Sequence, residues 1–154
     1  MASLTSKEFM KSIERRGGEA AHKGWVELIT SQEWNLPATV MVTVTFAIPK
    51  YSAGAVIDPL VGIGKELRFK RVLWAVEDHA DRSIGKHAHG VIELVAAGDI
   101  HRHDLEGYLR GLGNSKVERI YELAGAAGYV TKTLPGGSDY YLFPRPEMWG
   151  LGNS

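Results

Sequence analysis

The sequence predicts an α+β domain in which helices pack against a central antiparallel sheet. Segments rich in β-branched residues alternate with segments of helical periodicity, and the connections between them are rich in glycine. The chain has 154 residues, of which 44% are hydrophobic, 23% are charged and 18 are glycine. This composition is typical of globular proteins, and the length fits one hydrophobic core. We expect a single domain over residues 1–154, with residues 1–35 as a helical N-terminal extension.

Apolar periodicity and turn residues give the order of the expected elements. Helices are predicted at residues 5–16, 24–33, 104–112 and 124–134, and strands at residues 39–48, 69–76, 87–95, 116–122 and 140–143. The stretch 49–67 contains Gly54, Pro59, Gly62 and Gly64, too many helix breakers for a regular helix. It is predicted to be a loop with one short helical turn. The strands at 69–76 and 87–95 flank a polar loop and are predicted to form a hairpin.

Charge and cysteine content narrow the possible functions. Eighteen Lys and Arg balance eighteen Asp and Glu, so no overall field attracts the chain to polyanions. Cysteine is absent, which excludes disulfides and thiolate metal sites. The sequence has neither a signal-peptide pattern nor an apolar stretch long enough for a bilayer, so we expect a cytoplasmic protein without a membrane partner. Nucleic-acid binding would need a local patch, for which the candidates are Lys50, Arg68, Lys70, Arg71 and Lys86.

His87 and His89 lie two residues apart on a predicted strand. Side chains at this spacing project from the same face, so the two imidazoles can converge on one metal ion. The hairpin brings the end of the preceding strand beside them, which makes Glu77 the preferred third ligand and His79 the alternative. Two histidines and a carboxylate leave positions open for water or substrate. The pattern therefore indicates a catalytic type of metal site.

Tyr129 and Lys132 lie three positions apart on the predicted helix 124–134, so both can address one phosphate. A tyrosine can act as a covalent nucleophile beside a cation and a metal. Each pair also has an ordinary interpretation, namely a half-buried tyrosine with a solvated lysine, and a histidine pair that arose by chance. His101 and His103 have the same spacing in a predicted polar turn and are interpreted as surface residues.

The order of these parts resembles a known family. The strand containing Thr43-Val44-Thr45-Phe46, then His87-Ala88-His89, then Tyr129 with Lys132 resembles the three motifs of rolling-circle replication initiators of the HUH endonuclease superfamily. The resemblance covers about residues 39–134. A tyrosine that follows the histidines is similar to the initiator or transposase branch, and its single occurrence implies a single-tyrosine enzyme. Tyr140 and Tyr141 are interpreted as core or edge residues.

The resemblance implies an RRM-like sandwich that acts as a site-specific, metal-dependent nickase on single-stranded DNA. It implies that Glu77, His87 and His89 hold Mg²⁺ or Mn²⁺. Tyr129 would then form a 5′-phosphotyrosyl link and release a 3′-OH, with Lys132 positioning the phosphate. The implied partners are single-stranded DNA or an origin hairpin, together with a host helicase and replisome. Residues 1–35 have no counterpart in the motifs.

Two other functions remain open from the sequence. A non-catalytic RRM-like module would bind single strands by stacking bases on aromatic side chains such as Phe46, Tyr51 and Trp74. A different metalloenzyme, such as a cupin-like barrel, would use the same two histidines and glutamate for oxygen chemistry. Only the nickase requires Tyr129 for activity, so a Tyr129→Phe variant separates it from both alternatives.

Overall fold

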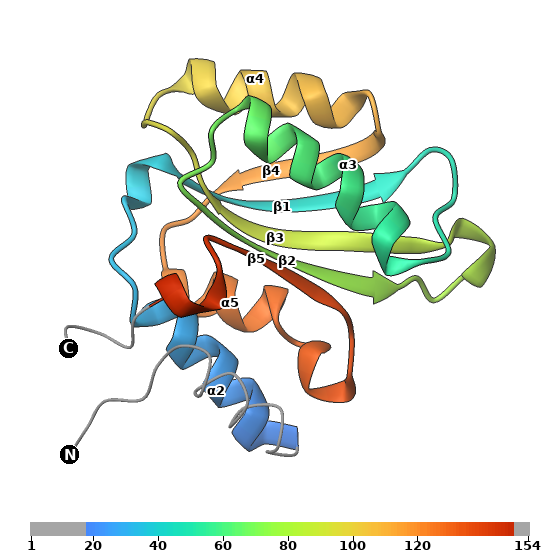
Figure 1. Ribbon diagram of the computed structural model, residues 1–154, viewed down its shortest axis with the longest axis horizontal. Coiled ribbons are helices and arrows are strands. Elements are labelled where there is room, and N and C mark those ends of the chain that lie inside the picture. The colour runs from blue at the N-terminus through green and yellow to red at the C-terminus, as the bar shows by residue number, and fades with distance from the viewer. Residues whose placement is uncertain (1–17, 150–154) are drawn as a thin grey trace.

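Five strands form one antiparallel sheet in the order β4-β1-β3-β2-β5 in the computed structural model, which describes residues 18–149. The strands are β1 (Thr39–Phe46), β2 (Arg71–Asp78), β3 (Lys86–Glu93), β4 (Gly113–Arg119) and β5 (Tyr140–Phe143). The helices are α2 (Gly18–Thr30), α3 (Ala53–Glu66), α4 (Asp99–Arg110) and α5 (Leu123–Val130). Figure 1 shows α3 and α4 on one side of the sheet and α2 and α5 on the other. The predicted α+β class is confirmed.

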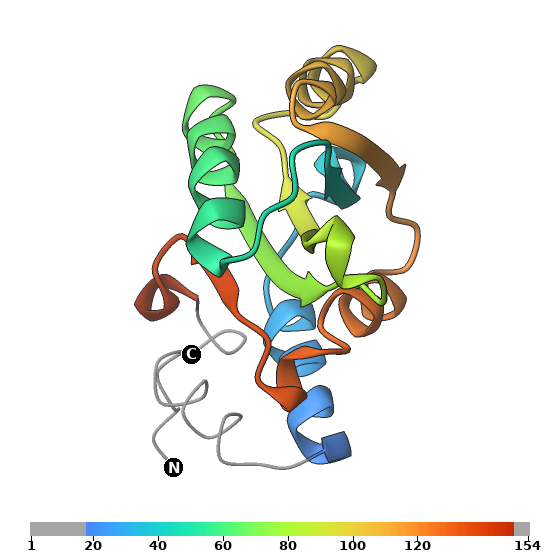
Figure 2. The same cartoon turned by 90° about the vertical axis from the view of Figure 1, so that its right-hand side faces the viewer.

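The sheet separates two hydrophobic cores because alternate strand residues point to opposite faces. On β2, Trp74 packs in the core beneath α3 and α4, whereas Leu73 packs in the core beneath α2 and α5. On β3, Ile92 and Val91 divide between the two cores in the same way. Figure 2 looks toward the loop between β2 and β3 and shows helices on both sides of the sheet. Odd-numbered residues of β2 and β3 therefore face α2 and α5.

The region 49–67, predicted to be a loop, is instead the helix α3, so this prediction is wrong. The Ser52 side chain caps the helix by accepting a hydrogen bond of 3.1 Å from the backbone N–H of Ala55. Val56, Leu60 and Ile63 recur at helical spacing and are all buried against the sheet. Burial of this apolar face outweighs the cost of the glycines and the proline, which local propensity alone does not show.

Other predicted elements are present with shifted ends. The helix α2 runs from Gly18 to Thr30 rather than over 24–33, β2 begins and ends two residues later than predicted, and β4 begins and ends three residues earlier. α4 begins at Asp99, so His101 and His103 lie on a helix and not in a turn. α5 ends at Val130, so Lys132 follows the helix in a turn. The helix predicted at 5–16 lies outside the described residues.

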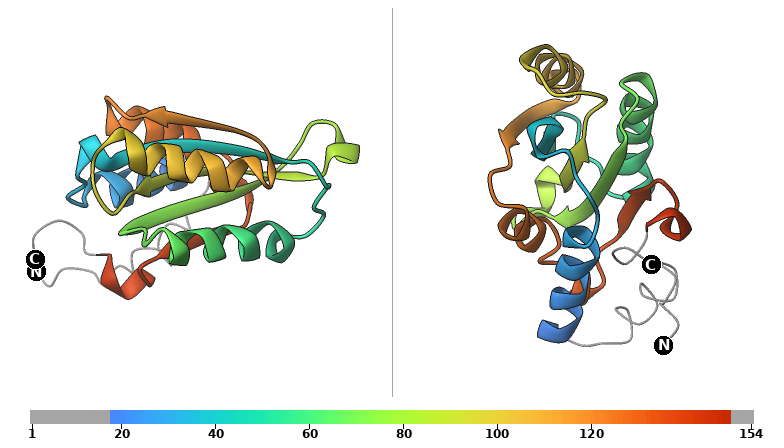
Figure 3. Two further views of the ribbon diagram at one scale, coloured as in Figure 1. Left: turned by 90° about the horizontal axis from the view of Figure 1, so that it is seen from above. Right: turned by 90° about the vertical axis from the view of Figure 1, so that its left-hand side faces the viewer.

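Close packing of β2 on β3 involves Gly90 and Trp74, which are paired across the ladder. A Cβ atom at position 90 would lie 2.5 Å from Cε3 of the Trp74 ring. Glycine at this position lets the indole lie against β3, on the face of the sheet opposite to His89. Figure 3 shows the β2–β3 loop projecting at one end of the sheet, here called the hairpin end. None of the helices within residues 18–149 is long and apolar enough to cross a membrane.

Candidate metal centre and the tyrosine beside it

Glu77, His87 and His89 converge near the hairpin end, on the face covered by α2 and α5. Glu77 and His87 are partners in the β2–β3 ladder, and His89 follows on the same face. His89 Nε2 lies 3.3 Å from Glu77 Oε2, and His87 Nε2 lies 3.9 Å from Glu77 Oε1. The two Nε2 atoms are 3.1 Å apart. These three residues, called the ligand group below, are thus brought together as metal ligands would be.

The ligand group suits a divalent cation. Glu77 Oε2 and His87 Nδ1 are buried and have no hydrogen-bond partner within the described residues. A buried polar atom left unsatisfied costs about 1–3 kcal/mol, and a cation at Glu77 would remove that penalty at the carboxylate. The 3.1 Å between the imidazole nitrogens is close to the spacing of neighbouring ligand atoms around an ion bonded at about 2.1 Å. The residues present therefore fit a site with two nitrogen ligands and one carboxylate.

Burial sets the charge state of the ligand group. Loss of solvation, followed by repulsion from Lys132 and from His87, lowers the pKa of His89 to about 4. Burial, assisted by His79 and Lys132, also lowers the pKa of His87. Burial raises the pKa of Glu77, against a smaller opposing effect of Lys132. Both imidazoles are therefore neutral at neutral pH, the form in which histidine binds a metal.

Thr43 of β1 holds His89 from the side opposite to Glu77. Its Oγ1 lies 3.1 Å from His89 Nδ1, and the two residues are partners in the β1–β3 ladder. When Nδ1 carries the proton and donates it to Oγ1, Nε2 keeps a lone pair directed toward Glu77. The sequence places Thr43 within a strand motif but does not predict its contact with His89. The pairing of β1 with β3, which brings the two side chains together, is not visible in either segment alone.

Tyr129 and Lys132 lie beside the ligand group although both come from the far end of the chain. The Tyr129 ring meets the His89 ring edge to face, with centroids 5.2 Å apart, and the tyrosine is 47% exposed. Lys132 Nζ lies 3.8 Å from the Tyr129 ring centroid and 3.9 Å from Glu77 Oε1. Buried Ala127 packs in the core one helical turn before the loop that carries Lys132. All five predicted site residues therefore share one location.

The other histidines lie outside the ligand group. His79 follows the end of β2, where its Nδ1 accepts a 3.0 Å hydrogen bond from the backbone N–H of Asp81. Its ring contacts only the outer side of the group, with a centroid 5.5 Å from that of His87. Within the described residues, the three side chains that could hold one ion include Glu77 and not His79. His101 and His103 are carried by α4, which packs on the opposite face of the sheet.

The basic patch expected from the sequence is divided between two ends of the sheet. Arg71 is the first residue of β2, whereas Lys86 pairs with Asp78, which is the last residue of the same strand. Seven steps along a strand separate these ends by roughly 23 Å. The Arg71 guanidinium lies 5.0 Å from the Trp34 ring centre and 5.5 Å from that of Trp149. The prediction of one patch is therefore wrong, and Arg71 has a packing role.

One cation near Tyr129 was missed by sequence analysis. Lys116 of β4 is the ladder partner of Thr43, which places it on the edge strand beside the site. It interacts electrostatically with Tyr129, although its closest partner is Glu118, and hydrogen bonding to Glu118 raises the pKa of Lys116. Only the order of the strands reveals this proximity, because β4 is far from the histidines in sequence.

Two of the three aromatic residues considered for base stacking are unsuitable for it. Phe46 and Trp74 are buried in the core beneath α3 and α4, and only Tyr51 exposes its ring.

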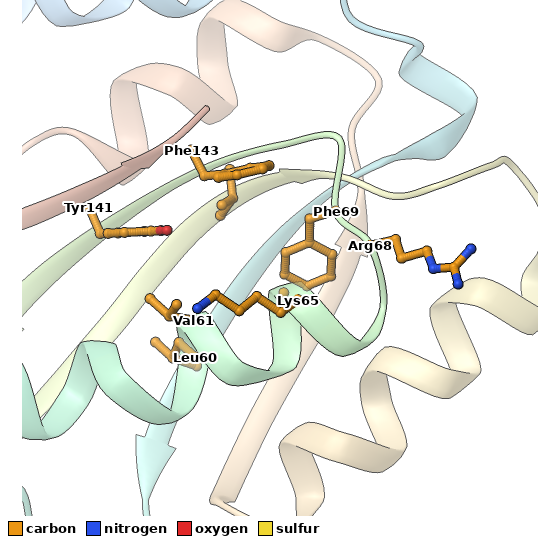
Figure 4. Close-up of a pocket in the computed structure, with 9 residues that line it drawn as sticks. Leu60, Val61, Lys65, Arg68, Phe69, Tyr141 and Phe143 are labelled. Atoms are coloured by element: carbon orange, nitrogen blue, oxygen red, sulfur yellow. The ribbon is translucent and has the colours of Figure 1, made fainter. Parts of the chain in front are cut away.

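A separate pocket of about 380 Å³ lies between α3 and β5 (Figure 4). There Tyr141 and Phe143 form one wall, and the Lys65 amine extends toward Tyr141. This pocket contains no member of the ligand group.

Comparisons of the chain with protein-family models, with curated proteins and with solved structures find no match. The function of this protein is therefore inferred from the geometry of the ligand group and of the tyrosine and lysine beside it.

Proposed function

We propose that this protein is a metal-dependent endonuclease that nicks single-stranded DNA through a covalent bond to Tyr129. The observation that carries the proposal is the position of Tyr129 and Lys132 against the ligand group. A β-hairpin and a helix that is distant in sequence contribute to one site, so local composition does not explain their convergence. The same five residues carry the resemblance to HUH rolling-circle initiators, and this agreement supports the proposal.

Glu77, His87 and His89 would hold the ion, for which we propose Mg²⁺ or Mn²⁺. When bound, such an ion supplies positive charge that polarises a phosphodiester and neutralises the charge that develops on its oxygens. Neutral imidazoles and a carboxylate leave a net positive charge at the centre. The His89–Thr43 contact would keep one imidazole in the required orientation.

Tyr129 would supply the nucleophile. Its phenolic oxygen attacks phosphorus, the bond from phosphorus to O3′ breaks, and a 5′-phosphotyrosyl link forms. The phenolic proton passes to water, and the released O3′ takes up a proton from water, so the strand ends in a 3′-OH. Lys132 would bind a non-bridging phosphate oxygen, because its ammonium group lies between the tyrosine ring and Glu77. Reversal of the same step rejoins strands.

A labelled pool of single-stranded oligonucleotides, which includes hairpins, tests the proposal when incubated with the protein and Mn²⁺. A denaturation-resistant adduct on a gel is expected, and EDTA should abolish it. Tyr129→Phe should lose the adduct and still bind Mn²⁺ in calorimetry. Tyr121→Phe is the matched control, because Tyr121 is strongly exposed just before α5 and should keep the adduct.

Three results would contradict the proposal. An adduct that persists in Tyr129→Phe would assign the nucleophile to another residue. Mn²⁺ binding without an adduct across the pool would favour a different His/carboxylate metalloenzyme. Strand binding without either metal binding or an adduct would favour a non-catalytic binding module.

A further inference from the structure

His22 of α2 makes a polar contact with the helix that carries Tyr129. Its Nε2 atom lies 2.8 Å from the backbone carbonyl oxygen of Gly128, the residue before the tyrosine. A carbonyl oxygen only accepts hydrogen bonds, so Nε2 carries the proton and donates it. Residues 1–35 have no counterpart in the motifs that carry the resemblance to HUH endonucleases. The contact therefore lies outside that resemblance.

The Gly128 carbonyl takes its donor from α2 because α5 ends just beyond it. The last carbonyls of a helix have no donor within the helix. A further helical turn would supply the backbone N–H of Lys132, but this N–H is directed to the Tyr129 carbonyl at 3.5 Å instead. The chain bends at Thr131, whose ψ is 4° rather than the value of about −42° typical of a helix. His22 thus replaces the donor that a longer helix would supply.

The neighbouring carbonyl, that of Ala127, is satisfied from within the same segment. Thr131 donates to it twice, from its backbone N–H at 3.1 Å and from its buried hydroxyl at 2.7 Å. The two carbonyls at the end of α5 are therefore held differently. Thr131 fixes one of them locally, whereas the other depends on a side chain from a distant helix.

The helix α2 is a firm support for this contact. It packs against α5, and Figure 1 shows the two helices on the same side of the sheet. A Cβ atom at Gly128 would lie 4.0 Å from Cγ2 of Val26, one helical turn beyond His22. The residues of α2 that are buried in the core shared with α5 are Ala21, Trp25, Leu28 and Ile29. Since this packing does not involve the imidazole, loss of the His22 hydrogen bond should alter the end of α5 and leave α2 in place.

The position of the Lys132 ammonium depends on how the chain leaves α5. Its nitrogen lies 3.8 Å from the Tyr129 ring centroid and 3.9 Å from Glu77 Oε1. The contact with Glu77 is too long for a hydrogen bond, so no directional bond to the carboxylate holds the ammonium there. The direction of the backbone at Thr131 and Lys132 is thus the main restraint on the cation.

We propose that His22 is a positioning residue for Lys132. Its bond to the Gly128 carbonyl keeps the Lys132 N–H from extending α5, and the ammonium stays between the Tyr129 ring and Glu77. Without His22, the Lys132 N–H bonds to the Gly128 carbonyl, α5 lengthens, and the ammonium moves away from Glu77. The consequence for DNA cleavage rests on the proposed nickase function, whereas the consequence for metal binding does not.

Mn²⁺ titration of the full chain by calorimetry tests the effect on the metal centre. His22→Leu should bind Mn²⁺ about twofold to fivefold more tightly, because a positive charge leaves the vicinity of the carboxylate. His22→Gln keeps an N–H donor at similar reach and should bind as the wild type does. In a Lys132→Met protein, His22→Leu should change the affinity no further, since the cation through which it acts is gone.

The rate of adduct formation with single-stranded oligonucleotides tests the effect on the reaction. At saturating oligonucleotide, His22→Leu should slow the adduct by about threefold to thirtyfold, because Lys132 is no longer held at the phosphate. His22→Gln should restore the rate. Thr30→Val is the matched control, since it loses a 2.8 Å side-chain hydrogen bond to the Val26 carbonyl within α2 and should change neither quantity.

Tighter Mn²⁺ binding separates positioning from a general role in stability, because partial unfolding would weaken it. Unchanged or weaker binding in His22→Leu, or an equal increase with and without Lys132, would overturn the inference. If the wild type forms adducts and His22→Leu forms them at the same rate, the inference is wrong and the nickase proposal stands. If the wild type binds Mn²⁺ and forms no adduct, the nickase proposal is overturned and the Mn²⁺ titrations alone decide the role of His22. A wild type that binds no Mn²⁺ overturns both.

Discussion

The ammonium nitrogen of Lys132 lies 3.8 Å from the centre of the Tyr129 ring. The same nitrogen is 3.9 Å from Oε1 of Glu77. The first contact is a cation–π interaction, worth about 0.5–1 kcal/mol where a site is partly exposed. The second contact places a positive charge where a metal ion would also be attracted. Lys132 would therefore weaken metal binding by repulsion and, separately, stabilise the negative charge of the phosphate. These two effects have opposite signs and can be measured separately.

Lys132→Met should increase the affinity for Mn²⁺ and slow the formation of the adduct. Removal of the cation ends its repulsion of a metal ion, so we expect Mn²⁺ to bind about threefold to tenfold more tightly in calorimetry. Loss of charge at the phosphate should slow adduct formation by roughly 10- to 100-fold. Lys65→Met, on α3, should change neither value. A parallel fall in both quantities would show that Lys132 acts through the fold of the site.

Thr43→Val should weaken metal binding by about 10- to 100-fold, because His89 loses the partner that orients its ring. Thr45→Val is the control, since Thr45 lies two residues further on the same face of β1 and pairs with His87 in the ladder. Mn²⁺ titration of both variants by calorimetry measures the difference. Equal affinities in the two variants would mean that the Thr43 contact does not orient His89.

Gly90→Ala should destabilise the protein by about 1–3 kcal/mol, because the new methyl group would overlap the Trp74 ring. Chemical denaturation measures this change in the free energy of unfolding. Gly62→Ala provides the opposite case, since nothing lies within 4 Å of a Cβ there and the position is inside α3. That variant should be stabilised by about 0.5–1 kcal/mol. A Gly90→Ala protein of unchanged stability would contradict the close packing of β2 on β3.

Acidification should destabilise the metal-free protein through His89. Its pKa is about 4 in the folded protein against an ordinary value of 6.5, so the unfolded chain binds more protons between these pH values. The free energy of unfolding should therefore fall as the pH is lowered from about 6.5 to about 4, by up to about 3 kcal/mol. Glu77 has a raised pKa and acts in the opposite sense, because its contribution to stability is lost as the pH rises.

Comparison of the wild type with His89→Gln in EDTA separates these two contributions, since Glu77 is present in both proteins. Chemical denaturation at several pH values should show a smaller loss of stability on acidification in the variant. His103→Gln, at an exposed position on α4, should behave as the wild type. A loss of stability in His89→Gln as large as that in the wild type would assign the pH dependence to other groups.

Local sequence determined the parts of this site that lie within one element or one hairpin. The period of two along a strand places His87 and His89 on the same face. A polar loop between two apolar segments is enough to bring Glu77 beside them, and the ladder has this register. Tyr129 lies near the end of α5 and Lys132 three positions later in the turn that follows, so this short separation is enough for both to approach the same point. These relationships involve short distances along the chain, where residue type and spacing dominate.

Tertiary structure decided the rest, because it depended on which elements pack together. The glycines and proline of 49–67 argue against a helix, yet burial of Val56, Leu60 and Ile63 against the sheet stabilises α3. The strand order puts Thr43 against His89 and Lys116 near Tyr129. The length of β2 also separates Arg71, at the start of that strand, from Lys86 at the hairpin end, so the two cations do not form one patch. Such contacts join distant segments, and their energies come from burial and pairing that no single segment contains.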